Sequence, residues 1–144
     1  MTVAIEELTD VTDEVVAAFS RLLPQLSTSA KPLDAAAIRT VVSSPSVTVL
    51  LARDEGKIIG SLSLVVFRIP TAVRAWVEDV VVDQAAGRKG TGTALVQEAV
   101  ERAKAAGART VDLTTRPARV AAGNLYEKVG FQQRDTRVYR YSFE

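Results

Sequence analysis

The run Gly87–Gly92, which reads GRKGTG, holds the residues of this chain whose types and spacing most clearly indicate chemistry. The preceding Val80–Val82 is typical of a buried strand, and residues 95–103 place apolar side chains at helical spacing. A strand that leads through a glycine-rich loop into a helix directs unpaired backbone N–H groups and the positive end of the helix dipole at one point. Arg88 and Lys89 add positive charge there. The chemistry indicated is the binding of a phosphate or pyrophosphate.

Two common phosphate-binding motifs are absent from this loop. Gly92 is followed by Thr93 rather than lysine, so the Walker pattern does not fit. The spacing of Gly87, Gly90 and Gly92 also differs from the dinucleotide-binding GxGxxG. A turn without any ligand stays an alternative, because glycine-rich turns also join strands to helices where nothing binds.

Composition narrows the classes of protein to which the chain can belong. The length of 144 residues and an apolar content of 47% predict a single globular domain over residues 1–144. The net charge of +1 favours neither nucleic acid nor a membrane surface as a partner. Without cysteine or histidine the chain lacks thiolate metal sites, Ser-His and Cys-His nucleophiles and the commonest metal ligand, and we expect no metal.

The N-terminal residues give an expectation for location. The sequence MTVAIEELTD is acidic and has no signal-peptide pattern, and no apolar run reaches membrane-spanning length. We therefore expect a cytoplasmic protein.

Hydrophobic periodicity and turn residues predict the elements that position the loop. Strands are expected at 3–6, 47–53, 58–67, 77–82, 110–113, 131–133 and 138–143. A first helix is expected after helix-start residues at 9–10 and 12–14, with an apolar face over 15–26 that Pro24 should end or kink. Further helices are expected at 34–42, over the apolar face at 95–103 with Gly107 as the C-terminal cap, and at 119–129. Residues 68–74 are expected to form a polar connection marked by a proline. The strands at 77–82 and 110–113 flank a helix, so they should be parallel. The predicted fold is α/β with a mixed central sheet, in the order β-α-α-β-β-β-α-β-α-β-β.

Two motifs in this arrangement resemble the GCN5-related N-acetyltransferase (GNAT) family. The family's central loop follows a strand that ends in V-x-[D/N], which here is Val81-Val82-Asp83, followed by Gly87–Gly92. The second motif, L-Y-E-K-x-G-F, is present as Leu125–Phe131. The resemblance covers residues 47–143. It implies a GNAT fold in which the central strand carries a bulge and splays from the next parallel strand.

The resemblance also implies that acetyl-CoA is the cosubstrate. Pantetheine would bind backbone groups of the central strand, and the pyrophosphate would bind the loop and the start of the helix. The residues implied are Val80, Val81, Val82, Gly87, Arg88, Lys89, Gly90, Thr91, Gly92, Thr93 and Asn124. The family's loop Gln/Arg position is occupied by Gly87, and its helix Asn position by Arg119, with Asn124 displaced from it.

Two residues are candidates for catalysis in direct transfer of the acetyl group to an amine. The resemblance implies that Tyr126 protonates the departing thiolate; on an amphipathic helix it could instead be a packing residue. Glu78 is the candidate base for the substrate ammonium, with a salt bridge to Arg68, Arg74 or another basic residue as the alternative. Strand alternation places Glu78 on the face of Trp76 and Val80, unless a bulge resets the phase.

The acceptor is the part of the function that the sequence leaves open. The leading hypothesis is an acetyl-CoA-dependent N-acetyltransferase that acts on a primary amine of a small molecule. The segment VEDVVV also resembles the corresponding strand of glucosamine-6-phosphate acetyltransferases. The alternatives are a protein or peptide N-acetyltransferase and an acyl-CoA-binding module without turnover. A homodimer is also compatible with the sequence.

Overall fold

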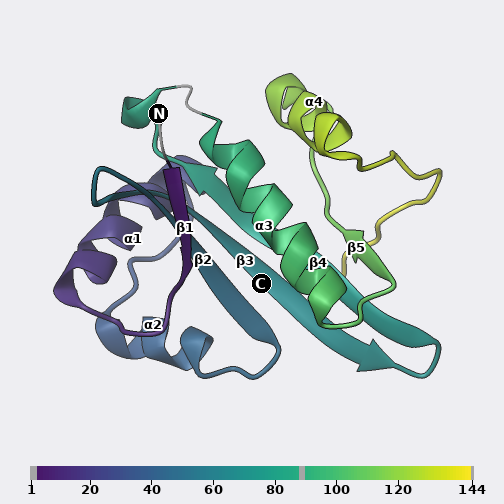
Figure 1. Cartoon of the computed structure of the whole chain (residues 1–144), viewed down its shortest axis with the longest axis horizontal. Coiled ribbons are helices and arrows are strands. Elements are labelled where there is room, and N and C mark those ends of the chain that lie inside the picture. Colours follow the sequence, from purple (N-terminus) through teal and green to yellow (C-terminus); the bar gives the residue numbers. More distant parts are fainter. Residues whose placement is uncertain (1–2, 88–89, 144) are drawn as a thin grey trace. The chain divides into compact units, whose positions relative to one another are not determined.

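The computed structural model describes residues 3–87 and 90–143. The chain divides into two compact units, residues 1–114 and 115–144, and each is described by itself (Figure 1). The predicted single domain over residues 1–144 stays a prediction. In the first unit the described elements are β1 (Val3–Glu7), α1 (Asp13–Leu26), α2 (Ala35–Val42), β2 (Val47–Asp54), β3 (Lys57–Ile69), β4 (Ala72–Val82), η1 (Gln84–Ala86), α3 (Thr91–Ala105) and β5 (Thr110–Asp112). The second unit contains α4 (Val120–Val129).

The strands of the first unit form one mixed sheet in the order β1-β2-β3-β4-β5. The three pairs from β1 to β4 are antiparallel, and β4 with β5 is parallel. The parallel pair is joined through α3, as the predicted β-α-β unit requires. The predicted mixed α/β sheet is therefore confirmed.

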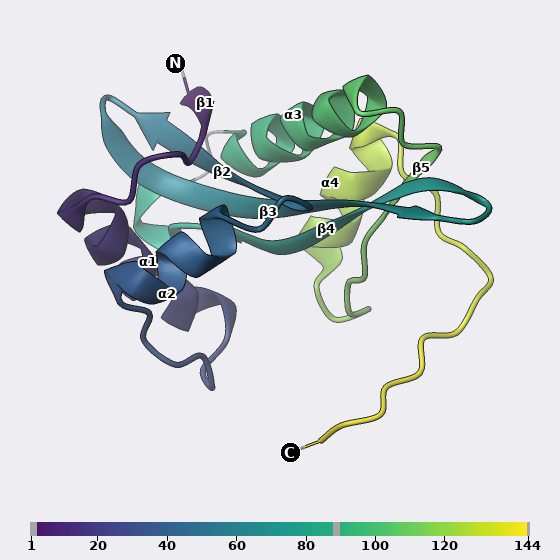
Figure 2. The same ribbon diagram turned by 90° about the horizontal axis from the view of Figure 1, so that it is seen from below.

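Helices cover both faces of this sheet, α1 and α2 on one side and α3 on the other (Figure 2). On the first side, Val15 and Leu22 of α1 and Ile38 of α2 belong to a buried cluster with Val49 and Leu51 of β2. On the second side, the buried Leu95 of α3 lies close to Gly60 of β3. A Cβ on Gly60 would lie 3.1 Å from the Val81 carbonyl oxygen and 3.2 Å from Leu95 Cδ1. Glycine at this position therefore lets α3 approach the sheet closely.

Side-chain caps explain where the first two helices begin. Thr12 Oγ1 accepts from the Val15 N–H at 3.3 Å, and Asp34 Oδ1 accepts from the Ala37 N–H at 2.8 Å. Each bond satisfies one N–H that the helix leaves without an internal partner. Pro24 lies in the last turn of α1, which ends two residues later at Leu26. Of the two predicted start signals for the first helix, the one at residues 12–14 is confirmed, and Asp34 begins the second helix as predicted.

Residues 68–74 differ from the prediction of a polar connection. They form the end of β3 and the beginning of β4, because Ile69 pairs with Ala72 across a two-residue turn. Pro70, in that turn, presets the backbone for a reversal rather than for a longer loop. The strand that carries Glu78 therefore begins earlier than expected.

The two predicted closing strands, residues 131–133 and 138–143, are the clearest error in the predicted element order. The described residues 131–143 form neither strand nor helix. Their alternating apolar pattern leaves Tyr139, Tyr141 and Phe143 at 86%, 86% and 95% exposure. A strand exists only with a hydrogen-bonded neighbour, and alternation alone does not supply one.

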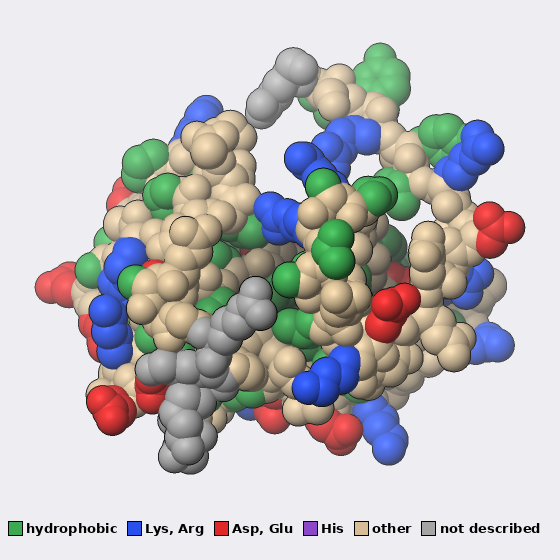
Figure 3. Space-filling model, turned by 90° about the horizontal axis from the view of Figure 1, so that it is seen from above, with side chains coloured by type: hydrophobic (Ala, Val, Ile, Leu, Met, Phe, Trp, Pro, Cys, Tyr) green, Lys and Arg blue, Asp and Glu red, His purple; other side chains and the backbone are tan. Residues whose placement is uncertain are grey.

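The surface and the helices show two further features. Basic and acidic side chains both occur on the face shown in Figure 3, as a net charge of +1 suggests. None of the helices in the described part of the chain is both long and apolar enough to cross a membrane.

Candidate functional site

The strand β4 carries a bulge at Asp79 and Val80. Val81 pairs with Ser61 of β3, whereas Glu78 pairs with Ser63, so β4 has one residue more than β3 between these pairs. Asp79 takes a positive φ of 51°, an uncommon conformation for a residue other than glycine. The bulge that the family resemblance implied is thus present.

The bulge resets the alternation of side chains along β4. Before it, Trp76 and Glu78 pair with Val65 and Ser63; after it, Val81 pairs with Ser61 on the same face. Val81 belongs to the buried cluster that α1 and α2 cover. Glu78 therefore shares the α1–α2 face of the sheet with Trp76 and Val81. Simple alternation predicted Val80 on this face, but the bulge puts Val81 there instead.

Glu78 is exposed on this face. Among the described residues it forms no salt bridge, so the ion pair with Arg68 or Arg74 is not observed. Arg74 lies four positions earlier on β4, about 13 Å along an extended strand. Arg68 pairs with Val73, which places it further along the hairpin. Glu78 thus keeps a carboxylate available to a ligand.

The edge of β4 that faces β5 is paired over only a short stretch. Arg74, Ala75 and Trp76 pair with Thr110, Val111 and Asp112, and β4 then continues to Val82 without a β5 partner among the described residues. The parallel strands are therefore splayed, as expected. The backbone of β4 beyond Trp76 has no strand partner on this side among the described residues, so it can offer peptide groups to an extended ligand.

The loop after β4 contains two glycines in conformations that other residues disfavour. Gly87 has φ 72° and ψ −165°, and Gly90 has φ 70° and ψ 17° at the N-cap of α3. Arg88 and Lys89, predicted to bind the cofactor, lie outside the described residues.

The first turn of α3 has donors to offer. No side-chain hydrogen bond caps this helix in the described part of the chain. Its first internal bond runs from the Ala94 N–H to the Gly90 carbonyl oxygen at 3.0 Å. The N–H groups of Thr91, Gly92 and Thr93 therefore have no partner within the helix and suit an anion.

Asp83 links the end of β4 to the glycine loop and to α1. Its buried carboxylate accepts from Arg21 Nε at 3.1 Å, from Gln25 Nε2 at 3.2 Å and from the Ala85 N–H at 3.0 Å. Burial raises the pKa of Asp83, but these three hydrogen bonds and the Arg21 charge together hold it below its ordinary value. The carboxylate is thus charged at neutral pH.

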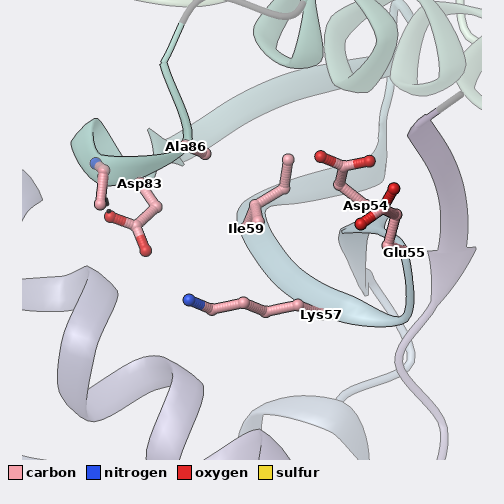
Figure 4. A pocket seen from close by; sticks show the side chains of 7 residues that line it. Asp54, Glu55, Lys57, Ile59, Asp83 and Ala86 are labelled. Carbon is pink, nitrogen blue, oxygen red and sulfur yellow. Dashed lines mark hydrogen bonds between the residues drawn. The ribbon is translucent and has the colours of Figure 1, made fainter. Parts of the chain in front are cut away.

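A cavity of about 280 Å³ borders the turn that follows Asp83. Lys57 and Glu55, from the hairpin between β2 and β3, line it together with Asp83 and Ala86 (Figure 4). Its walls carry charges of both signs and belong to the β2–β3 hairpin and to the turn after β4. Glu78 and the splayed edge of β4 are not part of its lining.

The second unit contains Tyr126, the candidate acid, on α4. Tyr126 is half-buried, and its ring meets Phe131 edge to face at a centroid distance of 6.0 Å. Burial raises the pKa of the phenol, an effect that the Arg119 charge partly offsets, so the hydroxyl keeps its proton at neutral pH. Asn124, predicted to contact the cofactor, is exposed on the same helix.

The structure thus brings together the predicted residues of β4, the described loop glycines and the start of α3, all within the first unit. Sequence reasoning missed Arg21 and Gln25. They lie on α1, some 60 residues before Asp83, and the sequence carries no signal for a contact at that separation. Within the described residues no group of three or more acidic, cysteine or histidine side chains could hold a metal ion.

A family model identifies the class of protein that this fold and site define. The model of the acetyltransferase (GNAT) family matches residues 10–131. The chain therefore belongs to the GNAT family of acetyltransferases. No curated protein sequence matches the chain.

Solved structures share the fold across almost the whole chain. An aminoglycoside acetyltransferase from an uncultured soil metagenomic sample, in complex with sisomicin, has a TM-score of 0.83 and 19% identity over 99% of this chain and 96% of its own. Glucosamine-6-phosphate N-acetyltransferase from Arabidopsis thaliana has a TM-score of 0.78 and 21% identity over the whole of both chains. Ribosomal-protein-alanine N-acetyltransferase from Brucella melitensis biovar Abortus 2308 has a TM-score of 0.80 and 20% identity over 99% of this chain and 100% of its own. At these identities the likeness establishes the fold.

Proposed function

We propose that this protein is an acetyl-CoA-dependent N-acetyltransferase that acts on a primary amine of a small molecule. The observation that carries the proposal is the bulged β4, splayed from β5 and followed directly by the glycine loop, in a chain of the GNAT family. An acyl-CoA-binding module without turnover is less well supported, because Glu78 and Tyr126 provide the two groups that turnover needs.

The residues around β4 and α3 fit the parts of acetyl-CoA. The N–H groups of Thr91, Gly92 and Thr93, which have no partner within α3, would bind the pyrophosphate, together with the predicted Arg88 and Lys89. Gly87 and Gly90 allow the backbone to come close to it. Backbone groups of Val80–Val82 would bind the pantetheine amides in the gap beside β4, and Asn124 stays a predicted contact.

The chain supplies the remaining chemistry with few groups. Acetyl-CoA, when bound, supplies an acetyl thioester that an amine can attack. Glu78 would take a proton from the substrate ammonium, directly or through water. A backbone N–H at the bulge would stabilise the oxyanion, and Tyr126 would protonate the CoA thiolate. No covalent intermediate with the protein is needed.

A small-molecule acceptor is the better supported of the two acceptor classes. Two of the compared structures are named for small amines, an aminoglycoside and glucosamine 6-phosphate, and one is named for a ribosomal protein. The half-buried Trp76 stands beside Glu78 on the same face of β4 and can contact such an acceptor. A peptide acceptor is the outcome that would replace this part of the proposal.

Thermal unfolding with acetyl-CoA tests the cosubstrate. A ligand that binds only the native state raises the melting temperature. Gly90→Val should remove this shift, because a β-branched residue disfavours the positive φ at the start of α3. The variant should still fold, because a Cβ at this position would have no atom within 4 Å. A variant that keeps the full shift would contradict the assignment of the loop.

Release of CoA thiol, followed with a panel of amines and peptides, tests the reaction. Thiol release with a small amine supports the proposal, and release only with a peptide would change the acceptor class. Binding without thiol release for any acceptor would favour the acyl-CoA-binding module.

We also infer a cytoplasmic location and a homodimer, each as part of the proposal. The exposed Val138, Tyr139, Tyr141 and Phe143 support the dimer, because association would cover an apolar segment. Light scattering coupled to size exclusion measures the mass in solution. A monomer at high protein concentration would contradict the dimer and leave the enzymatic proposal unaffected.

A further inference from the structure

Two polar side chains of α1, Arg21 and Gln25, contact Asp83 just after the end of β4, although they lie some 60 residues earlier in the sequence. Arg21 donates from Nε to Asp83 and from a terminal nitrogen to the Ile58 carbonyl oxygen at 2.7 Å. These two hydrogen bonds connect α1 to the beginning of β3 and to the residue that follows β4. The Asp83 side chain is only 5% exposed, so its charge depends on these partners rather than on water.

Gln25 holds the same point through both ends of its amide. Its Nε2 donates to Asp83 Oδ1 at 3.2 Å and to the Arg21 carbonyl oxygen at 3.1 Å. Its Oε1 accepts from the Gln84 N–H at 2.9 Å. One side chain of α1 therefore fixes both the carboxylate of Asp83 and the backbone of the next residue.

The turn that follows is built on these two residues. The Ala86 N–H donates to the Asp83 carbonyl oxygen at 3.0 Å, and the Gly87 N–H donates to the Gln84 carbonyl oxygen at 3.2 Å. A shift of Asp83 or Gln84 would consequently be passed on to Gly87, where the glycine loop begins. The buried network thus sets the starting point of the loop.

We propose that Arg21 and Gln25 are positioning residues for the acetyl-CoA loop. They act through Asp83 and Gln84 and touch neither cosubstrate nor acceptor. The inference rests on the proposed function, since it assumes that the loop binds acetyl-CoA. A network with a purely structural role would stabilise the fold without affecting the affinity for the cosubstrate.

The chain offers a matched control at the other end of α1. Arg53 donates to Glu14 of α1 at 2.9 Å and 3.0 Å, to the Gly56 carbonyl oxygen at 2.7 Å and to Glu6. This cluster also joins α1 to the sheet, and its hairpin lines the same cavity as the turn after Asp83, but the hydrogen bonds of Arg53 go to Glu6, Glu14 and Gly56 and not to Asp83 or Gln84. Arg53→Met therefore removes comparable contacts from α1 without touching Asp83 or Gln84.

Calorimetric titration with acetyl-CoA, together with steady-state kinetics, measures the effect of the variants. Gln25→Met and Arg21→Met should each raise Kd and KM for acetyl-CoA about tenfold, the factor expected when a hydrogen-bonded support is lost. We expect kcat at saturation to stay within about twofold, because the reacting groups are untouched. Arg21→Lys, which keeps one charged donor, should recover part of the affinity, and Arg53→Met should bind as the wild type does.

Amide hydrogen exchange gives a readout that needs no ligand. The exposed Gln84 has its N–H protected by Gln25 Oε1, so Gln25→Met should accelerate exchange at this amide while Arg53→Met leaves it unchanged. Faster exchange in Gln25→Met with an unaltered Kd would overturn the positioning role, as would equal losses of affinity in Gln25→Met and Arg53→Met. A wild type that fails to bind acetyl-CoA would instead overturn the proposed function, and the positioning role with it.

Discussion

The strand β4 meets its two neighbours in contrasting ways. Towards β3 it is paired from Ala72 to Val82, interrupted only by the bulge. Towards β5 it is paired only from Arg74 to Trp76. Both edges belong to one strand, so the difference lies in the neighbours rather than in the propensity of the β4 residues.

The two edges of β4 have different roles. The edge paired with β3 contributes to the stability of the fold, and the edge left unpaired beyond β5 is the one proposed to bind the cosubstrate. On the closed edge, β3 contributes the buried Leu62 and Leu64 and pairs its backbone with β4. On the open edge, backbone groups stay available at the cost of hydrogen bonds that a longer β5 would have formed. Changes at the closed edge should therefore lower stability, and changes at the open edge should lower activity.

The largest effect is expected from Leu64→Ala, on the closed edge. Leu64 is 2% exposed and lies opposite Val77, so its truncation leaves a cavity. The free energy of unfolding, measured with urea, should fall by about 2–5 kcal/mol. Val41→Ala, at a side chain that is 39% exposed, is the control with little loss. If the folded Leu64→Ala protein loses affinity for acetyl-CoA more than twofold, the separation of the two edges fails.

The next effect concerns Tyr126, the residue proposed as the acid. Tyr126→Phe keeps the ring that packs on Phe131 but removes the donor. General acids contribute about 10²–10⁴-fold, and a thiolate leaves easily, so kcat should fall by about 10². Affinity for acetyl-CoA should change little. The same change at the exposed Tyr139 is the control.

An unchanged kcat in Tyr126→Phe would assign this tyrosine to packing, provided that chemistry limits the rate in both proteins. Water would then supply the proton to the thiolate.

A smaller effect is expected from Glu78→Gln. The base is needed only while the amine is protonated, so turnover should fall by about tenfold at pH values below the pKa of the acceptor amine. Wild type and variant should converge above it. Glu98→Gln removes a carboxylate that pairs with Arg102 on α3 and serves as the control. A pH–rate profile identical to that of the wild type would show that Glu78 is not the base.

The smallest effect is expected at Asp83, the residue that directly follows β4. Because the folded pKa of Asp83 is lowered, its charge stabilises the fold above the unfolded pKa of about 3.9, and this contribution is lost as the pH falls through the folded pKa. Asp83→Asn should lower the free energy of unfolding at neutral pH by about 1 kcal/mol. The difference from wild type should shrink below about pH 4. A difference that is constant with pH would mean that the charge contributes nothing.

The sequence predicted most elements because local signals and core packing agree. Thr12 and Asp34 begin their helices, and the nearly continuous apolar runs of β2 and β3 match a sheet covered on both faces. Glu98 and Arg102 of α3 have the i,i+4 spacing that suits an ion pair, and Arg102 Nε donates to Glu98 at 2.7 Å. The local pattern gave a wrong prediction at residues 131–133 and 138–143, because a strand forms only where a neighbouring strand pairs with it.

The candidate site was predictable only in part. The glycine loop follows from spacing, and the bulge came from the family resemblance rather than from any residue of β4. Asp79, the residue with the positive φ, carries no signal for it in its type alone. The contacts of Arg21 and Gln25 with Asp83 depend on how α1 crosses the sheet, which no local pattern encodes.

The last paired position between β4 and β5 has an optical consequence. Trp76, the single tryptophan of the chain, stands there opposite Asp112 and beside the point where the strands part. The indole emission therefore reports from one place, and that place borders the gap proposed for pantetheine. A shift of the emission wavelength, or a loss of emission intensity, on addition of acetyl-CoA would report binding next to β4 in real time, without a label and without turnover.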